Sequence, residues 1–218
     1  MSKNALLTLV VVVMVAAGAP AGPTAEQSGA GHNHIGHVAD AWNDTPEGQG
    51  LLPTALAEAR IAAQHAGLAA RDPSDLAAMK LHAAHALHAV DPSSIENGPG
   101  LGYGVKRAAE GSAKHIQAAA ATEGASQAVT AHASHVAASA QNTVDRSDRI
   151  VELASRIQDA SSAAVAAPLI EELNTLAQQL VDGTDADGDG QVSWQEGEGG
   201  LAQAELHLGL MKKAEGLP

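Results

Sequence analysis

The chain has 218 residues, 12 basic and 25 acidic side chains, a formal net charge of −13 and no cysteine. The lack of cysteine excludes disulfides, thiolate metal sites, iron–sulfur clusters and covalently attached c-type haem. The acidic charge and the scarcity of aromatic residues argue against nucleic-acid binding, and the abundance of alanine favours an all-α fold.

The amino-terminal residues have the pattern of a secretory signal. Lys3 precedes an apolar run over residues 5–17, which is shorter than the roughly twenty residues that span a bilayer. Ala19-Pro20-Ala21 supplies the small residues of a cleavage site. We expect residues 1–21 to be a signal peptide and the protein to be soluble and periplasmic or secreted. Retention as an amino-terminal membrane anchor is the alternative.

Residues 22–50 are rich in glycine, proline and histidine and show no helical period, which predicts a flexible arm. Within it, residues 31–37 read GHNHIGH and offer loose binding of copper or zinc, although short histidine clusters often have no biological role.

From Leu51 onward the pattern becomes that of an alanine-rich helical bundle of five or six helices. We expect Asp72 or Ser74 to cap the second helix, and Ser161 or Ser162 together with Pro168 to break or kink the chain before the helix from residue 169. The expected helices cover residues 51–70, 75–90, 105–121, 125–159, 169–181 and 201–213.

A complete calcium-loop pattern lies near the carboxyl end. Residues 185–196 read DADGDGQVSWQE, with acids at positions 1, 3 and 5, glycine at 6, an aliphatic residue at 8 and glutamate at 12. Alternate short carboxylates on a tight turn supply the oxygens that calcium requires. The predicted calcium ligands are Asp185, Asp187, Asp189, the carbonyl of Gln191, Ser193 and Glu196.

This segment resembles the EF-hand calcium-binding family over residues 169–213. The resemblance implies a helix–loop–helix unit that binds calcium, here residues 168–218 packing on a histidine-containing bundle of residues 51–167. The family usually pairs two loops through position eight, here Val192, but this chain has no second matching loop. Three glycines follow Glu196 closely, so the exiting helix should start late or bend. A structural or loosely regulatory site is therefore expected.

Candidate metal-binding histidines lie on four of the predicted helices. In residues 75–90, Leu76, Met79, Ala83, Leu87 and Val90 form a core stripe, whereas His85 and His88 project to the opposite side and His82 flanks the stripe. A faint repeat shifted by twenty residues, attributable to duplication or chance, pairs His65 with His85.

These helices can each present an imidazole to a shared interior, which suggests a bound transition metal or haem. Imidazole ligands point to zinc, copper(II), nickel or iron. The alternative is that the histidines are ordinary buried or surface polar residues. The candidate ligands are His65, His82, His85, His88, His115, His132 and His135.

Motifs of the common catalytic classes are missing from the sequence, including GxSxG, HExxH and the P-loop, so we expect no enzyme. The leading interpretation is an exported calcium-binding helical protein, a non-catalytic binding or interaction module in which calcium orders the last helix. The alternative is a metal-handling or electron-transfer protein that binds a transition metal or haem. We expect the protein to bind calcium and not nucleic acid, and to have no membrane-spanning segment after signal cleavage. A protein partner is possible but is not identified by the sequence.

Overall fold

The computed structural model describes residues 25–218, which contain seven α-helices, one short 3-10 helix and no strand. The predicted all-α class is therefore confirmed, whereas the predicted signal peptide lies outside the described residues. Among the described helices, none is both long enough and apolar enough to cross a membrane. The helices are α1 (Ala25–Ala39), η1 (Pro46–Gly48), α2 (Leu51–Ala69), α3 (Leu76–Val90), α4 (Val105–Ala121), α5 (Gln127–Asp159), α6 (Ala163–Asp182) and α7 (Leu201–Ala214).

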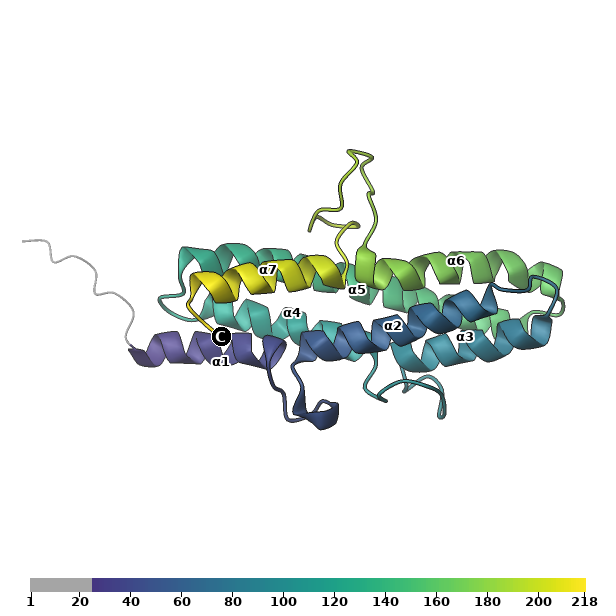
Figure 1. Ribbon diagram of the computed structural model, residues 1–218, viewed down its shortest axis with the longest axis horizontal. Helices are drawn as coiled ribbons and strands as arrows, with labels where there is room; N and C mark the ends of the chain where they lie inside the picture. Colours follow the sequence, from purple (N-terminus) through teal and green to yellow (C-terminus); the bar gives the residue numbers. More distant parts are fainter. Residues whose placement is uncertain (1–24) are drawn as a thin grey trace, which may run out of the picture.

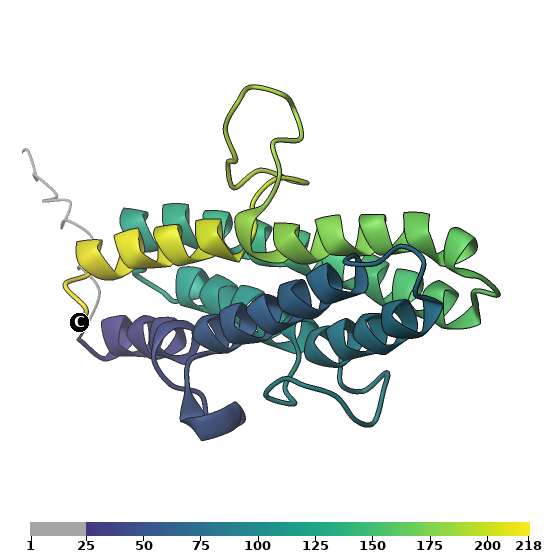
Figure 2. The same cartoon turned by 45° about the vertical axis from the view of Figure 1, so that its right-hand side comes forward.

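The helices form four antiparallel rods side by side (Figure 1). One rod is α5 alone, and each of the others consists of two helices placed end to end: α1 with α2, α3 with α4, and α6 with α7 (Figure 2). Both views show that the loops interrupting these three rods emerge near the middle of the bundle. The bundle thus has one half made of α1, α4, α7 and the start of α5, and another made of α2, α3, α6 and the end of α5.

The core combines large aliphatic side chains with many alanines. In the predicted stripe of α3, Met79, Ala83, Leu87 and Val90 are buried and Leu76 is partly buried against the core, which confirms the stripe. Alanine at close contacts lets helices approach one another, and each fully buried large aliphatic side chain stabilises the fold by about 1.5–3 kcal/mol. The largest fully buried side chains include Leu51, Leu52, Ile116, Ile150, Leu153, Ile157, Ile170, Leu173, Leu180 and Leu201.

Two predicted helix starts require correction. The side chain of Asp75, not Asp72 or Ser74, caps α3 by accepting a hydrogen bond from the amide of Ala78. The side chain of Ser162 caps α6 by accepting a hydrogen bond from the amide of Val165, so the helix begins before Pro168. Pro168 lies inside α6, where the helix loses only one amide donor.

The prediction of a flexible arm is wrong for residues 25–39, which form α1 and pack mainly on α4. Ile35 and Val38 on its inner face are fully buried. Their burial offsets the three glycines of this helix, each of which costs about 1 kcal/mol relative to alanine. Tertiary packing, which the local sequence pattern does not report, therefore decides the conformation of this segment.

Buried charges hold two of the mid-rod loops in place. The carboxylate of Glu58 on α2 accepts hydrogen bonds of 2.9–3.0 Å from the amides of Leu101, Tyr103 and Gly104. The guanidinium of Arg146 on α5 donates hydrogen bonds of 2.7–2.9 Å to the carbonyls of Gly197, Glu198 and Gly199. Each charged side chain thus satisfies the hydrogen-bonding capacity of several loop amides or carbonyls that have no partner within a helix.

Candidate metal centres

Nine of the eleven histidines gather into three clusters of the same construction. In each cluster two histidines lie three residues apart on one helix and a third comes from a neighbouring helix. In each cluster one nitrogen from every ring lies within 4.8 Å of the other two, and the residues are partly buried. Triad A is His34, His37 and His115; triad B is His65, His82 and His85; triad C is His132, His135 and His207.

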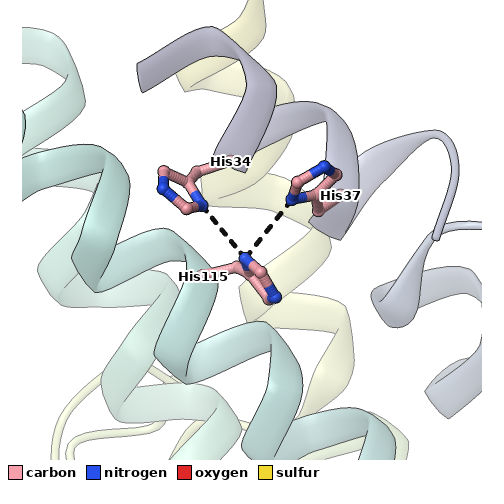
Figure 3. Close-up of side chains that lie close together, drawn as sticks. All are labelled: His34, His37 and His115. Atoms are coloured by element: carbon pink, nitrogen blue, oxygen red, sulfur yellow. Dashed lines mark hydrogen bonds between the residues drawn. The ribbon is translucent and has the colours of Figure 1, made fainter. Parts of the chain in front are cut away.

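Triad A joins α1 to α4. His34 and His37 extend from one face of α1 toward His115 (Figure 3). The Nδ1 atom of His115 lies 3.0 Å from Nδ1 of His34 and 3.4 Å from Nδ1 of His37. The indole of Trp42 lies beside the cluster, with ring-centroid distances of 4.6 Å to His115 and 4.7 Å to His37. The three imidazoles therefore converge next to an apolar wall.

Triad B joins α2 to α3. The Nδ1 atoms of His65 and His82 are 3.2 Å apart, and the ring of His85 lies 4.8 Å from that of His65 between centroids. The Nδ1 atom of His85 is shielded from solvent and has no hydrogen-bond partner. A buried polar atom without a partner carries a desolvation cost of about 1–3 kcal/mol, which a ligand in the triad would remove.

Triad C joins α5 to α7. The Nδ1 atom of His207 lies 3.1 Å from Nδ1 of His132 and 3.3 Å from Nδ1 of His135. The indole of Trp194, from the loop between α6 and α7, stacks on the ring of His135. Triads A and C thus share both the converging Nδ1 atoms and a neighbouring indole.

The spacing of these nitrogens fits a bound metal ion. Zinc–nitrogen bonds of about 2.0–2.1 Å place neighbouring ligands of a tetrahedral site about 3.3–3.4 Å apart. Five pairs of Nδ1 atoms in the triads, two in A, one in B and two in C, are 3.0–3.4 Å apart, and all ligand nitrogens of a triad lie within 4.8 Å of one another. A proton can join only two converging nitrogens, whereas a cation accepts the lone pairs of all three.

The environment of six triad histidines favours neutral imidazole, which is the form that binds metal. Burial, and after it the neighbouring His135 and His132, together lower the pKa of His207 to about 4. Burial first, and a neighbouring histidine second, also lowers the pKa of five other members of the triads, namely His37, His65, His85, His115 and His135.

Two histidines lie outside the triads. His88, a predicted ligand, is buried and its Nδ1 lies 3.0 Å from the carbonyl oxygen of Pro99, so it is not among the clustered histidines of the described residues. His32 on α1 lies 2.9 Å from a carboxylate oxygen of Glu215.

The structure brings the other six predicted histidines into triads but not into one shared interior. The pairs His82–His85 and His132–His135 lie at separate helix–helix contacts, and His115 faces α1. Sequence reasoning missed His34, His37 and His207 as members of defined sites. The recurrent spacing His-x-x-His was the available signal; it occurs at residues 34–37, 82–85, 85–88 and 132–135, and of these only 85–88 is not the pair of a triad.

The predicted calcium loop protrudes from the bundle between α6 and α7 (Figure 2). Carboxylate oxygens of Asp185, Asp187 and Asp189 lie within 4.8 Å of one another. Asp185 also accepts hydrogen bonds of 2.7 and 2.9 Å from the amides of Gly188 and Gly190.

The remaining predicted calcium ligands lie outside the group of three aspartates. Glu196 is exposed and lies outside the aspartate group, and the Ser193 hydroxyl accepts a hydrogen bond from the amide of Gln195. Gln191 is exposed, and its amide donates to Asp189. The exiting helix starts late, as predicted, since α7 begins at Leu201.

Comparison with known proteins gives no match: no family model, no curated protein and no solved structure is similar to this chain. The geometry of the candidate sites is therefore the basis for inferring function.

Proposed function

We propose that this protein binds transition-metal ions at the three imidazole triads and acts as a metal-handling protein, not as a catalyst. The observation that carries the proposal is the threefold repetition of one arrangement: a His-x-x-His pair and a third histidine whose ring nitrogens converge. Chance placement of surface histidines would not be expected to put nine of eleven into three such groups.

The donor set favours divalent ions of borderline softness. Neutral imidazole suits zinc, copper(II) and nickel, whereas soft copper(I) prefers thiolate or thioether ligands, which the triads lack. Nδ1 atoms 3.0–3.4 Å apart leave no space for a macrocycle between the rings. We therefore favour bare metal ions over the haem that the sequence left open.

The number of protein ligands favours a metal ion that can exchange over one that is bound permanently as a structural ion. Each triad offers three histidines, and the described residues add no fourth histidine, aspartate or glutamate to any of the three groups. Structural zinc sites usually have four protein ligands, while three-ligand sites leave one position for water or an incoming donor. Ligand exchange at this position would let each ion enter and leave without unfolding of the bundle.

Stoichiometry tests this function. Untagged protein is titrated with zinc in a calorimeter, and the metal content is measured by elemental analysis after dialysis. We expect three ions per chain, and two ions per chain in each of the variants His115→Ala, His65→Ala and His207→Ala. His32→Ala is the matched control, because His32 lies on α1 outside the triads, and it should retain three. Equal stoichiometry in all five proteins would contradict the proposal.

We also propose a calcium site at residues 185–196 as a second function. The complete twelve-residue pattern and the proximity of the Asp185, Asp187 and Asp189 carboxylates support it. A bound calcium ion would offset the repulsion among these carboxylates and order the loop that leads into α7.

Export remains part of the proposal and is supported by the sequence of residues 1–21. Amino-terminal sequencing of protein recovered outside the cytoplasm should begin at Gly22. Recovery of an uncleaved chain from the membrane fraction would support the anchor instead.

A further inference from the structure

Helix α1 is poorly suited to form by itself. Its sequence, AEQSGAGHNHIGHVA, contains three glycines, the residue with the lowest helix propensity after proline. Ile35 and Val38 are its only large aliphatic side chains that are fully buried. Because an isolated helix of fifteen residues is marginal in water even with favourable residues, contacts with the rest of the bundle must hold α1 in place.

The contacts that hold α1 differ from those at the other triads. Triad B connects α2 and α3, and triad C connects α5 and α7, and both helix pairs pack extensively. α1 packs mainly on α4 and only lightly on α2 and α7. Its flanking polar contacts, His32 with Glu215 and Asp40 with Lys212, are partly exposed pairs of the kind that stabilises little. Triad A is therefore placed where a bridging ion has the largest structural effect.

We propose that metal binding at triad A controls whether α1 is docked on the bundle. The inference rests on the proposed metal-binding function and adds a regulatory role for one of the three sites. His34 and His37 belong to α1 and His115 belongs to α4, so only the docked state presents all three nitrogens to one ion (Figure 3). An ion that binds only the docked state at a free concentration 100 times its Kd shifts the docking equilibrium about 100-fold.

Undocking of α1 would change the surface and the fluorescence of the protein. The movement would uncover Ile35 and Val38 and the face of α4 on which α1 packs. Trp42 follows α1 directly and its indole lies against His37 and His115, so its emission should shift to longer wavelength when α1 leaves. Metal loading thus decides whether this apolar surface is covered.

Hydrogen–deuterium exchange of the untagged protein, followed by mass spectrometry of peptides covering residues 25–39, tests the proposal. We expect zinc to slow exchange in α1 about tenfold or more relative to protein treated with a chelator, and to change α2 and α5 much less. The slowing should disappear in His115→Ala, whose substituted residue lies outside α1, and persist in His65→Ala, in which triad B is the one removed.

A second variant distinguishes whether the exchange of α1 reports its docking on the bundle or only metal coordination by its histidines. A Cβ at Gly29 or Gly36 would meet nothing within 4 Å, so the double variant Gly29→Ala/Gly36→Ala should favour helical α1 without disturbing the packing. In this variant we expect α1 to be protected from hydrogen exchange even without metal. The slowing of exchange by zinc should therefore be smaller, although three ions should still bind. Equal exchange of α1 with and without zinc in the original protein, at three bound ions, would overturn the docking proposal and leave the metal-binding function intact. Loss of stoichiometric binding would instead remove both.

Discussion

The indole of Trp194 stacks on the imidazole of His135, with ring centroids 4.0 Å apart and an angle of 16° between the planes. Trp194 is the tenth residue of the predicted calcium loop, and His135 is a ligand candidate of triad C, so one side chain touches both candidate sites. Trp42 occupies a comparable place beside triad A, and the sequence has no third tryptophan that could serve triad B. Two of the triads therefore carry their own fluorescent reporter.

Copper(II) should quench each tryptophan through its own triad. In the variant Trp42→Phe, Trp194 is the only tryptophan, so its emission is observed alone with excitation that selects tryptophan over tyrosine. A paramagnetic ion bound to His135 would lie within a few ångströms of the indole. We expect most of the Trp194 emission to disappear on addition of one to three equivalents of copper(II), measured by steady-state fluorescence.

The control for this quenching is the removal of one ligand. Adding His207→Ala to Trp42→Phe should weaken copper binding at triad C and shift quenching to copper concentrations at least about tenfold higher. Loss of a direct ligand should cost no less than the roughly 10–100-fold loss of metal affinity that follows mutation of an outer-shell partner. Adding His65→Ala should leave the Trp194 titration unchanged. Identical titrations in the two double variants would show that copper does not bind at triad C.

Terbium should report on the acidic loop separately. A lanthanide takes the oxygen ligands of calcium, and excitation of Trp194 within the loop should sensitise terbium luminescence. We expect Asp187→Asn to reduce the luminescence at limiting terbium, and excess calcium to displace it. Asp145→Asn provides a matched control, because Asp145 is an aspartate on α5 outside the group. An equal loss of signal in both variants would place the terbium elsewhere.

Local patterns in the sequence were sufficient to predict most of the helices. The periodic stripe of residues 76–90 and similar local patterns depend on neighbours in the chain, so α2, α3, α4 and α5 lie within a few residues of their predicted bounds. The segment of α1 has no such pattern, because its stability comes from burying Ile35 and Val38 against distant helices. The end-to-end stacking of helices into rods is likewise a tertiary property.

The histidine sites were predictable only in part for a similar reason. A His-x-x-His pair is visible in the sequence, but its third partner is not: His115 is 78 residues from His37, and His207 is 72 residues from His135. The sequence predicted imidazoles that face one shared interior, whereas the structure places the partly buried His132 at the edge of the core, where His207 can reach it. Which helices are neighbours decides the triads, and that information is not local.

Arg146 should be essential for anchoring the loop between α6 and α7. It is buried and donates to three main-chain carbonyls, so Arg146→Met leaves buried acceptors without donors. We expect a loss of about 3 kcal/mol in the free energy of unfolding, measured by urea denaturation. Arg149→Met is the matched control on the same helix: its ion pairs with Glu152 and Glu172 are exposed and should contribute less than about 1 kcal/mol. Equal losses would mean that Arg146 does not hold the loop.

Acidification should destabilise the metal-free protein in a defined pH window. The pKa of His207 is about 4 in the folded protein, below the ordinary histidine value of 6.5 that an unfolded chain would approach, so the unfolded state binds the proton first. The stability associated with this neutral imidazole is therefore complete above pH 6.5 and is lost as the pH falls toward 4. The other lowered histidines in the triads act in the same direction.

Thermal unfolding followed by circular dichroism at pH 7.5, 6.0, 5.0 and 4.5 measures this loss. We expect the Tm of the metal-free protein to fall through the series and the fall to be smaller in His207→Ala, which lacks the most strongly shifted group. Zinc should move the onset of the fall to lower pH, because the metal competes with protons for the same nitrogens and holds the folded state in which they converge. A constant Tm of the metal-free protein from pH 7.5 to 4.5 would contradict this prediction. The imidazoles of the triads would then have to bind protons as readily in the folded chain as in the unfolded one, contrary to their clustering at the helix–helix contacts.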